Sequence, residues 1–167
     1  MVIVAPDRQG HGIGKALMAD LLREIGNRAI LLNATTAGAP LYTALDAAAF
    51  GAPREAALRE VLAAGRAMVI ERAGAVAGFA ASRPFGRGVV NGPVVARDEA
   101  DACALVTALA TPGEFVRVDV VREAPSLVRM LTGAGLSCVD RVTPMRRGAW
   151  PKPGAARRFS LISQALG

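Results

Sequence analysis

The sequence of 167 residues predicts an α/β fold. Short apolar runs rich in β-branched residues alternate along the chain with longer segments whose apolar residues recur every three or four positions. Hydrophobic residues make up 52% of the chain, which is enough for the core of one ordinary domain or of two small ones. This composition argues against a disordered or collagen-like chain.

The first part of the chain predicts a strand, a glycine-rich turn, a helix, a second strand and a second helix. The strands are 2–4, which Pro6 stops, and 29–33. Pro40 can occupy the first turn of the second helix. The helix between the strands carries an apolar stripe at helical spacing, made of Leu17, Met18, Leu21, Leu22 and Ile25. This order is typical of a parallel α/β layer.

The rest of the chain predicts a second series of helices and strands. The expected helices cover 53–64, 98–109 and 125–132, and the expected strands cover 67–71, 76–81, 89–96, 115–121, 141–145 and 159–163. The first two of these strands form a hairpin that turns at Ala73-Gly74. Residues 83–88 are expected to be a loop, and Asn91-Gly92-Pro93 is expected to place a bulge in the next strand or divide it.

Composition also restricts the function. One histidine and two cysteines exclude a zinc site whose His and Cys ligands all come from this chain, and we expect no metal. No apolar run reaches the roughly 20 residues of a membrane span. The first residues lack the pattern of a signal peptide, so we expect a soluble cytoplasmic protein without membrane contact.

The net charge of +6 comes almost entirely from arginine. Such a surface attracts polyanions, although a compositional bias toward Ala, Gly and Arg explains the charge equally well. Basic residues gather near the C-terminus at Arg141, Arg146, Arg147, Lys152, Arg157 and Arg158. Because aromatic residues make up only 4% of the chain, we expect solvated charge there and no nucleic-acid partner.

The glycine-rich turn Gln9–Lys15 carries the clearest chemical signal. A strand that ends in such a turn and opens a helix presents unpaired N–H groups at the positive end of the helix dipole, which suits a phosphate or pyrophosphate. The dinucleotide fingerprint fails because Gly14 comes one residue too early. The Walker A pattern fails because Ala16 stands where Ser or Thr is needed.

A third pattern, Q/R-x-x-G-x-G/A, is matched by Gln9 to Gly14, and here the chain resembles the GNAT acetyltransferase superfamily. The resemblance implies a mixed sheet flanked by helices, acetyl-CoA as co-substrate, and N-acetyl transfer to an amine of a small molecule or peptide. It assigns cofactor binding to Val2, Ile3, Val4, Gln9, Gly10, His11, Gly12, Ile13, Gly14, Lys15 and Asn33. The alternative is a glycine-rich turn that binds nothing, with Asn33 as a strand-end cap.

Tyr42 is the single tyrosine of the chain and stands on the helix that follows Asn33. The resemblance implies that it protonates the departing CoA thiolate, and a phenol with a pKa near 10 suits that step. The alternative is a core-facing helix residue with a hydrogen-bonded hydroxyl. His11, within an anion-binding turn, is expected to face solvent or a phosphate.

The chain further resembles a tandem GNAT protein with a shortened first unit. We expect residues 1–45 to be a partial unit with the cofactor-binding loop, and residues 46–167 to be a near-complete unit without one. In the second unit the acidic segment Arg97–Ala102 replaces the glycines, and its carboxylates repel a pyrophosphate. An inactive CoA-binding or regulatory remnant therefore stays open as an alternative function, as does association into a homo-oligomer.

Overall fold

The computed structural model describes residues 6–8, 10–26, 30–33, 38–121, 123–143 and 154–166. Within them one sheet has six strands, with order β1-β2-β3-β4-β5 and with β6 beside β4. The strands are β1 (Ile30–Asn33), β2 (Arg66–Arg72), β3 (Ala75–Phe85), β4 (Gly88–Ala96), β5 (Val116–Arg117) and β6 (Arg157–Ser160). Only the β4–β5 pair is parallel among the described pairs, so the expected mixed sheet is confirmed.

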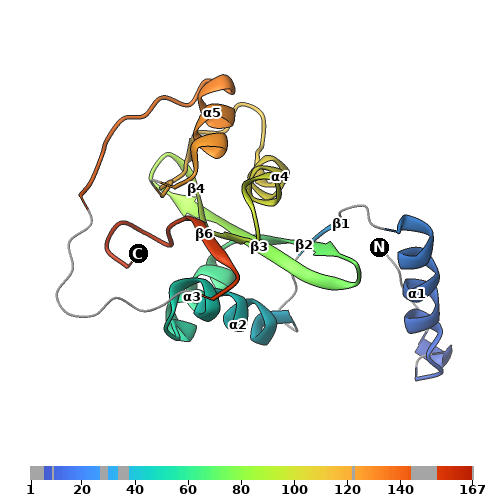
Figure 1. Cartoon of the computed structure of the whole chain (residues 1–167). Helices are drawn as coiled ribbons and strands as arrows, with labels where there is room; N and C mark the ends of the chain where they lie inside the picture. Colours follow the sequence, from blue (N-terminus) through green and yellow to red (C-terminus); the bar gives the residue numbers. More distant parts are fainter. Residues whose placement is uncertain are drawn as a thin grey trace.

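Helices cover both faces of this sheet (Figure 1). A short 3-10 helix, η1 (Pro6–Arg8), precedes the α-helices α1 (Ile13–Ile25), α2 (Ala39–Phe50), α3 (Glu55–Ala64), α4 (Glu99–Leu109) and α5 (Pro125–Gly133). Helices α4 and α5 lie on one face, α2 and α3 lie on the other, and α1 stands apart beyond β1. The boundary expected after residue 45 falls inside α2, and the division into two units stays a prediction.

The middle of the sheet is buried on both sides. Val94 belongs to the apolar cluster beneath α4 and α5, which also holds Leu105 and Phe159. Its neighbour Val95 belongs to the cluster beneath α2 and α3, together with Phe79. Successive side chains of a strand point to opposite faces, which explains why β4 is apolar at nearly every position.

Most of the predicted elements are confirmed to within a few residues, including α3, α4, α5 and the hairpin turn at Ala73-Gly74. The expected bulge is also confirmed, because the β3–β4 register shifts between Ala80 and Ser82. The predicted loop 83–88 is wrong. Strand β3 continues to Phe85 and β4 begins at Gly88, because Arg83 and Pro84 pair with β4.

Two predicted strands differ from the structure. Strand β5 is limited to Val116–Arg117, with a single further bridge from Val120 to Ser160. Residues 141–143 are not in a strand, and the rest of the predicted segment 141–145 lies outside the described residues. The predicted strand 2–4 also lies outside them. Strand β1 is confirmed, and it pairs antiparallel with β2.

Candidate functional site

The glycine-rich turn opens α1 as the sequence predicts. Gly10 and Gly12 have φ values of +80° and +74°, a left-handed conformation that glycine adopts without steric cost. The amide of Ala16 donates to the carbonyl oxygen of Gly12 at 2.9 Å, so the turn leads directly into the helix. The first turn of α1 carries no acidic side chain, and Lys15 is exposed. These residues can receive an anion.

The other predicted cofactor residues are described only in part. Val2, Ile3, Val4 and Gln9 lie outside the described residues. His11 and Ile13 are exposed within the turn, and Gly14 is half-buried. Asn33 ends β1, where its backbone is the register partner of Met68.

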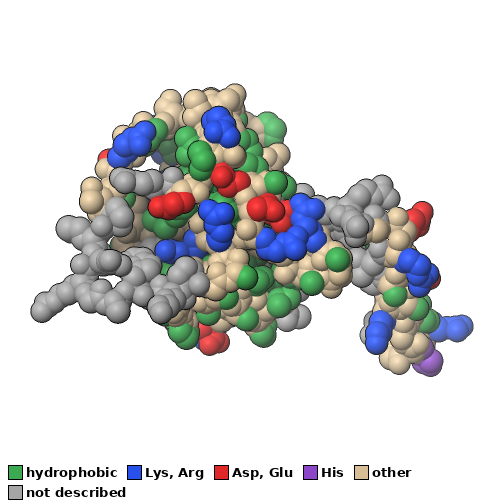
Figure 2. All heavy atoms as spheres, viewed as in Figure 1, with side chains coloured by type: hydrophobic (Ala, Val, Ile, Leu, Met, Phe, Trp, Pro, Cys, Tyr) green, Lys and Arg blue, Asp and Glu red, His purple; other side chains and the backbone are tan. Residues whose placement is uncertain are grey.

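Helix α1 presents an apolar stripe to solvent. The side chains of this stripe are 44% exposed at Ile13, 52% at Leu17 and 43% at Leu21. Figure 2 shows hydrophobic side chains on the surface of this helix. Figure 1 places α1 well away from α2, which carries Tyr42. The structure therefore does not bring the glycine-rich turn and Tyr42 into one site.

Tyr42 packs into the core beneath α2. It is 5% exposed, and its ring stacks on Phe79 with centroids 5.7 Å apart. Its hydroxyl lies against Gly38, where a Cβ atom would collide with it. This position agrees with the core-facing alternative, and the catalytic role of Tyr42 stays a prediction.

The parallel pair β4–β5 forms a second candidate site, since the two strands diverge after a short contact. Their register partners are Val89 with Val116 and Val90 with Arg117. Strand β6 lies in the divergence and pairs with the later part of β4 through Ser160, Arg158 and Arg157, opposite Val94, Val95 and Ala96.

Strand β6 also contacts the continuation of β5. The amide of Val121 donates to the carbonyl oxygen of Phe159 at 3.1 Å, and the amide of Leu161 donates to that of Asp119 at 3.0 Å. The chain's own backbone thus satisfies hydrogen-bonding groups on both sides of the divergence.

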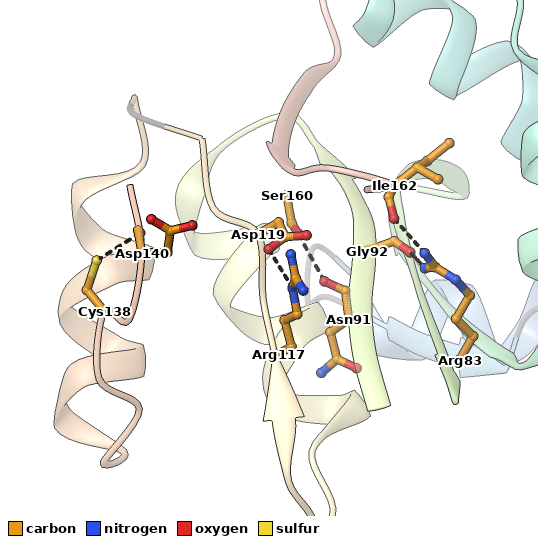
Figure 3. A network of polar contacts seen from close by, with 9 residues as sticks. All are labelled: Arg83, Asn91, Gly92, Arg117, Asp119, Cys138, Asp140, Ser160 and Ile162. Carbon is orange, nitrogen blue, oxygen red and sulfur yellow. Dashed lines mark hydrogen bonds and ion pairs between the residues drawn. The ribbon is translucent and has the colours of Figure 1, made fainter. Parts of the chain in front are cut away.

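Side chains hold β6 in this place (Figure 3). The Ser160 hydroxyl donates to the carbonyl oxygen of Asn91 at 3.0 Å. Arg83 donates to the carbonyl oxygens of Gly92 at 3.2 Å and Ile162 at 2.8 Å. Burial lowers the pKa of the Arg83 guanidinium, while the nearby Asp119 opposes that shift. The divergence is therefore closed by hydrogen bonds from several elements.

Carboxylates occupy the N-terminus of α4. Asp98 caps the helix by accepting from the amide of Asp101 at 2.9 Å. Glu99 accepts from the amides of Ser126 and Leu127, which begin α5. Asp101 is fully buried and pairs with Arg72, and this hydrogen bond raises the pKa of the guanidinium. The acidic segment thus fixes α4 to α5 and to the sheet.

The basic residues of β6 make contacts within the protein. The guanidinium of Arg158 lies 4.9 Å from the centre of the Phe50 ring, and burial lowers its pKa. Arg157 lies over the ring of Phe159 and donates to the carbonyl oxygen of Glu123 at 3.5 Å. Arg146, Arg147 and Lys152 lie outside the described residues.

The described residues do not favour a reactive thiol at Cys103 or a metal site. Both cysteines are free, and burial raises the pKa of the Cys103 thiol, which disfavours the reactive thiolate. Among the described residues no group of three His, Cys, Asp or Glu side chains could hold a metal ion. No helix in the described ranges is long and apolar enough to cross a membrane.

The mixed sheet with a diverging parallel pair and helices on both faces defines an α/β fold. Residues 42–159, more than half of the chain, match the family described as acetyltransferase (GNAT) domain. The chain belongs to the GNAT acetyltransferase family.

A solved structure agrees with this fold. A point mutant of TTHA1254 from Thermus thermophilus is similar with a TM-score of 0.53 and 19% identity, over 72% of this chain and 98% of that one. No curated protein matches the sequence.

Sequence reasoning did not foresee that β6 lies between β4 and β5. The available signal was the strand-like pattern at 159–163, which predicts a strand but not its neighbours. Phe159, the apolar residue of β6, indicates an interior strand but not which strands lie beside it.

Proposed function

We propose that the chain is a cytoplasmic N-acetyltransferase that uses acetyl-CoA and takes an amine of a small molecule or peptide as acceptor. The observation that carries this proposal is the glycine-rich turn, which opens α1 without an acidic side chain in a chain of the GNAT family. The pyrophosphate of the cofactor would be held by backbone N–H groups of Gly10 to Gly14, with Lys15 adding positive charge.

In the proposed reaction the acceptor nitrogen attacks the thioester carbonyl carbon. The carbon–sulfur bond breaks, the amine loses a proton and the CoA thiolate gains one, so atoms and charge balance. Tyr42 would supply the proton to the thiolate, the amine would release its proton to solvent water, and Tyr42 would regain a proton from solvent, which closes the balance. Because its hydroxyl lies beside Gly38 at the start of α2, that end of the helix would have to adjoin the thioester.

The second unit would support the reaction without binding the cofactor. Strand β6 fills the divergence of β4 and β5, and the first turn of α4 carries Glu99 and Asp101. A pyrophosphate at that helix would meet like charge. This unit would instead shape the acceptor site or stabilise the fold.

An inactive CoA-binding or regulatory remnant is the second candidate function. The separation of α1 from α2 favours it, because a chain that binds CoA at the turn need not bring Tyr42 to the thioester. Calorimetry with acetyl-CoA and a thiol-release assay with a panel of small amines separate the two. Turnover that falls with Tyr42→Phe supports the enzyme, whereas saturable binding without turnover supports the remnant.

The site itself is tested by Gly12→Ala, with Gly113→Ala as the matched control. The two glycines have φ values of +74° and +78°, and a Cβ atom at either would meet nothing within 4 Å. Each substitution therefore adds a similar backbone penalty of roughly 1–2 kcal/mol. We expect Gly12→Ala to weaken acetyl-CoA binding about tenfold, which is about 1.4 kcal/mol, with no change for Gly113→Ala. Equal affinities would exclude the turn as the cofactor site.

A further inference from the structure

Two exposed phenylalanines flank Gly88 at one end of the sheet. Phe85 of β3 is the register partner of Gly88 at the start of β4. On the other side of β4, the amide of Val89 donates to the carbonyl oxygen of Phe115 at 2.9 Å, and a Cβ atom at Gly88 would lie 2.9 Å from the Cβ atom of Phe115. Residues directly opposite each other in neighbouring strands share one face, so both rings belong to the same face with no side chain between them. Phe85 is 45% exposed and Phe115 is 53% exposed.

Two arginines form the next row on this face. Arg83 of β3 and Arg117 of β5 are the register partners of Val90, one on each side of β4. Residues two positions apart in a strand point to the same face, so this row lies directly beside the row of phenylalanines. Burial is the main cause of the lowered pKa of Arg83; Asp119 opposes the shift and the positive charge of Arg117 adds to it. The two guanidiniums are therefore close enough to repel each other.

Guanidiniums also lie against both phenyl rings. The guanidinium carbon of Arg117 is 4.8 Å from the centre of the Phe85 ring, although the two residues stand on opposite sides of β4. Arg87 is exposed in the hairpin turn between β3 and β4, and its guanidinium carbon is 5.1 Å from the centre of the Phe115 ring. Contacts of this kind hold a guanidinium parallel or close to a ring and leave its N–H groups available to an acceptor.

The positive charge of this face is only partly balanced. Asp119 pairs with Arg117 at 2.9 Å (Figure 3). Arg83 donates to two backbone carbonyl oxygens, and neither Arg83 nor Arg87 forms an ion pair within the described ranges. Glu114 lines a pocket on the opposite face of the sheet, together with side chains that alternate with the two rows. Three guanidiniums thus share one carboxylate.

We propose that this Phe–Arg face, made of Phe85, Phe115, Arg83, Arg87 and Arg117, binds an acidic segment of a partner protein. Carboxylates of the segment would accept from Arg87 and Arg117, and its apolar side chains would pack against the two rings. Aromatic and arginine side chains are enriched at protein interfaces, and the excess of positive charge selects an acidic partner. Because a guanidinium covers one face of each ring, the rings offer less surface for the stacking of nucleic-acid bases.

This proposal does not rest on acetyl transfer, because the Phe–Arg face involves neither the glycine-rich turn nor Tyr42. It is tested on the full chain by fluorescence anisotropy with a labelled peptide of Asp, Leu and Ser. A second peptide has Asn in place of every Asp, which keeps the shape and removes the charge. We expect saturable binding of the acidic peptide and a loss of at least about tenfold for the Asn peptide.

Three outcomes of the peptide assay would overturn the proposal. The first is equal binding of the acidic and the Asn peptide, and the second is no saturable binding of either. The third is tighter binding of a short labelled oligothymidylate than of the acidic peptide, which would identify the face as a nucleic-acid surface.

Arg87→Gln tests whether the charge acts at this place. It should weaken binding of the acidic peptide about fivefold, since it removes an exposed guanidinium–carboxylate contact. Arg129→Gln is the matched control, because it removes one positive charge from an exposed arginine of α5 that lies outside the Phe–Arg face. We expect the control to keep the affinity. Equal losses in the two variants would mean that only the net charge attracts the peptide, and the site would be wrong.

Phe85→Ala tests the apolar part of the face. Its matched control is Leu41→Ala on α2, because Leu41 is 47% exposed and Phe85 is 45% exposed. We expect Phe85→Ala to weaken peptide binding about tenfold and Leu41→Ala to leave it unchanged. Unchanged affinity in Phe85→Ala, with an unchanged melting temperature, would contradict a role of the rings in binding.

Discussion

Helices α1 and α4 begin with opposite charge. Helix α1 follows a turn with Gly10 and Gly12 in left-handed conformations, and its first turn has no acidic residue. Helix α4 follows β4 directly, is capped by Asp98 and carries two further carboxylates in its first turn. The dipoles of both helices favour negative charge at this end. In α4 the protein's own carboxylates supply it, whereas in α1 the end stays open to an external anion.

The packing around the two helices also differs. Helix α4 is packed between the sheet and α5, with Leu105 and Leu109 fully buried. Helix α1 exposes Leu17 and Leu21. Of the α4 carboxylates, Asp101 is fully buried, while Glu99 is half-buried and Asp98 is exposed. We infer that these carboxylates stabilise the fold, whereas the start of α1 is available for binding.

The largest expected effect comes from removing a carboxylate of α4. Asp101→Ala deletes a fully buried charge and leaves Arg72, which is 30% exposed, without its partner. Breaking a buried ion pair costs about 3 kcal/mol, at the lower end of the usual range because Arg72 reaches solvent. Urea denaturation measures the loss.

Asp20→Ala on α1 is the matched control for Asp101→Ala. Asp20 pairs with Arg23 at 2.8 Å, but both side chains are largely exposed. Exposed pairs of this kind contribute little, so we expect no measurable change in the unfolding midpoint. Similar losses for the two variants would show that the carboxylates of α4 have no special structural role.

The second prediction concerns a substitution that places a carboxylate in the first turn of α1, as in α4. Ile13 is 44% exposed at the first position of α1, so Ile13→Glu places a carboxylate where a cofactor phosphate would lie, without disturbing a core. The helix dipole favours the new charge, and we expect unchanged or slightly higher stability. We also expect acetyl-CoA affinity to fall about tenfold, or about 1.4 kcal/mol, in calorimetry.

Ile13→Gln is the control for this charge, because it keeps the length and polarity of the new side chain. It should retain most of the affinity. If Gln and Glu weaken binding equally, the effect is steric, and the proposed contrast between the two helix starts is wrong.

The contrast between α1 and α4 was largely predictable from the sequence. The glycines at positions 10, 12 and 14, and the acidic residues at 98, 99 and 101, determine the local charge of each helix start without reference to the rest of the fold. The range 98–109 expected for this helix also agrees with α4 (Glu99–Leu109). Such features depend on residues close in sequence, and these were confirmed.

Features that depend on distant residues were not predictable. The short β5 follows from the position of β6, whose residues come about 40 positions later in the chain. The extension of β3 through Arg83 and Pro84 requires the partners Val90 and Val89, although Pro84 alone reads as a strand end. The burial of Tyr42 against Phe79 likewise joins two elements separated in sequence.

The smallest expected effect concerns the thiols. Burial raises the pKa of Cys103 on α4, while Cys138 is exposed. Because the folded state holds the Cys103 thiol protonated, its contribution to stability is present below the pKa of the unfolded thiol. This contribution is lost as pH rises through the raised pKa of the folded state.

A thiol reagent at mildly alkaline pH should therefore modify Cys138 first and Cys103 more slowly, as followed by mass spectrometry. Cys103→Ala should flatten the alkaline decline of the melting temperature by a small amount, and Cys138→Ala should leave it unchanged. Faster modification of Cys103 would mean that α4 opens to solvent more readily than its packing implies, and the distinction between a packed α4 and an exposed α1 would weaken.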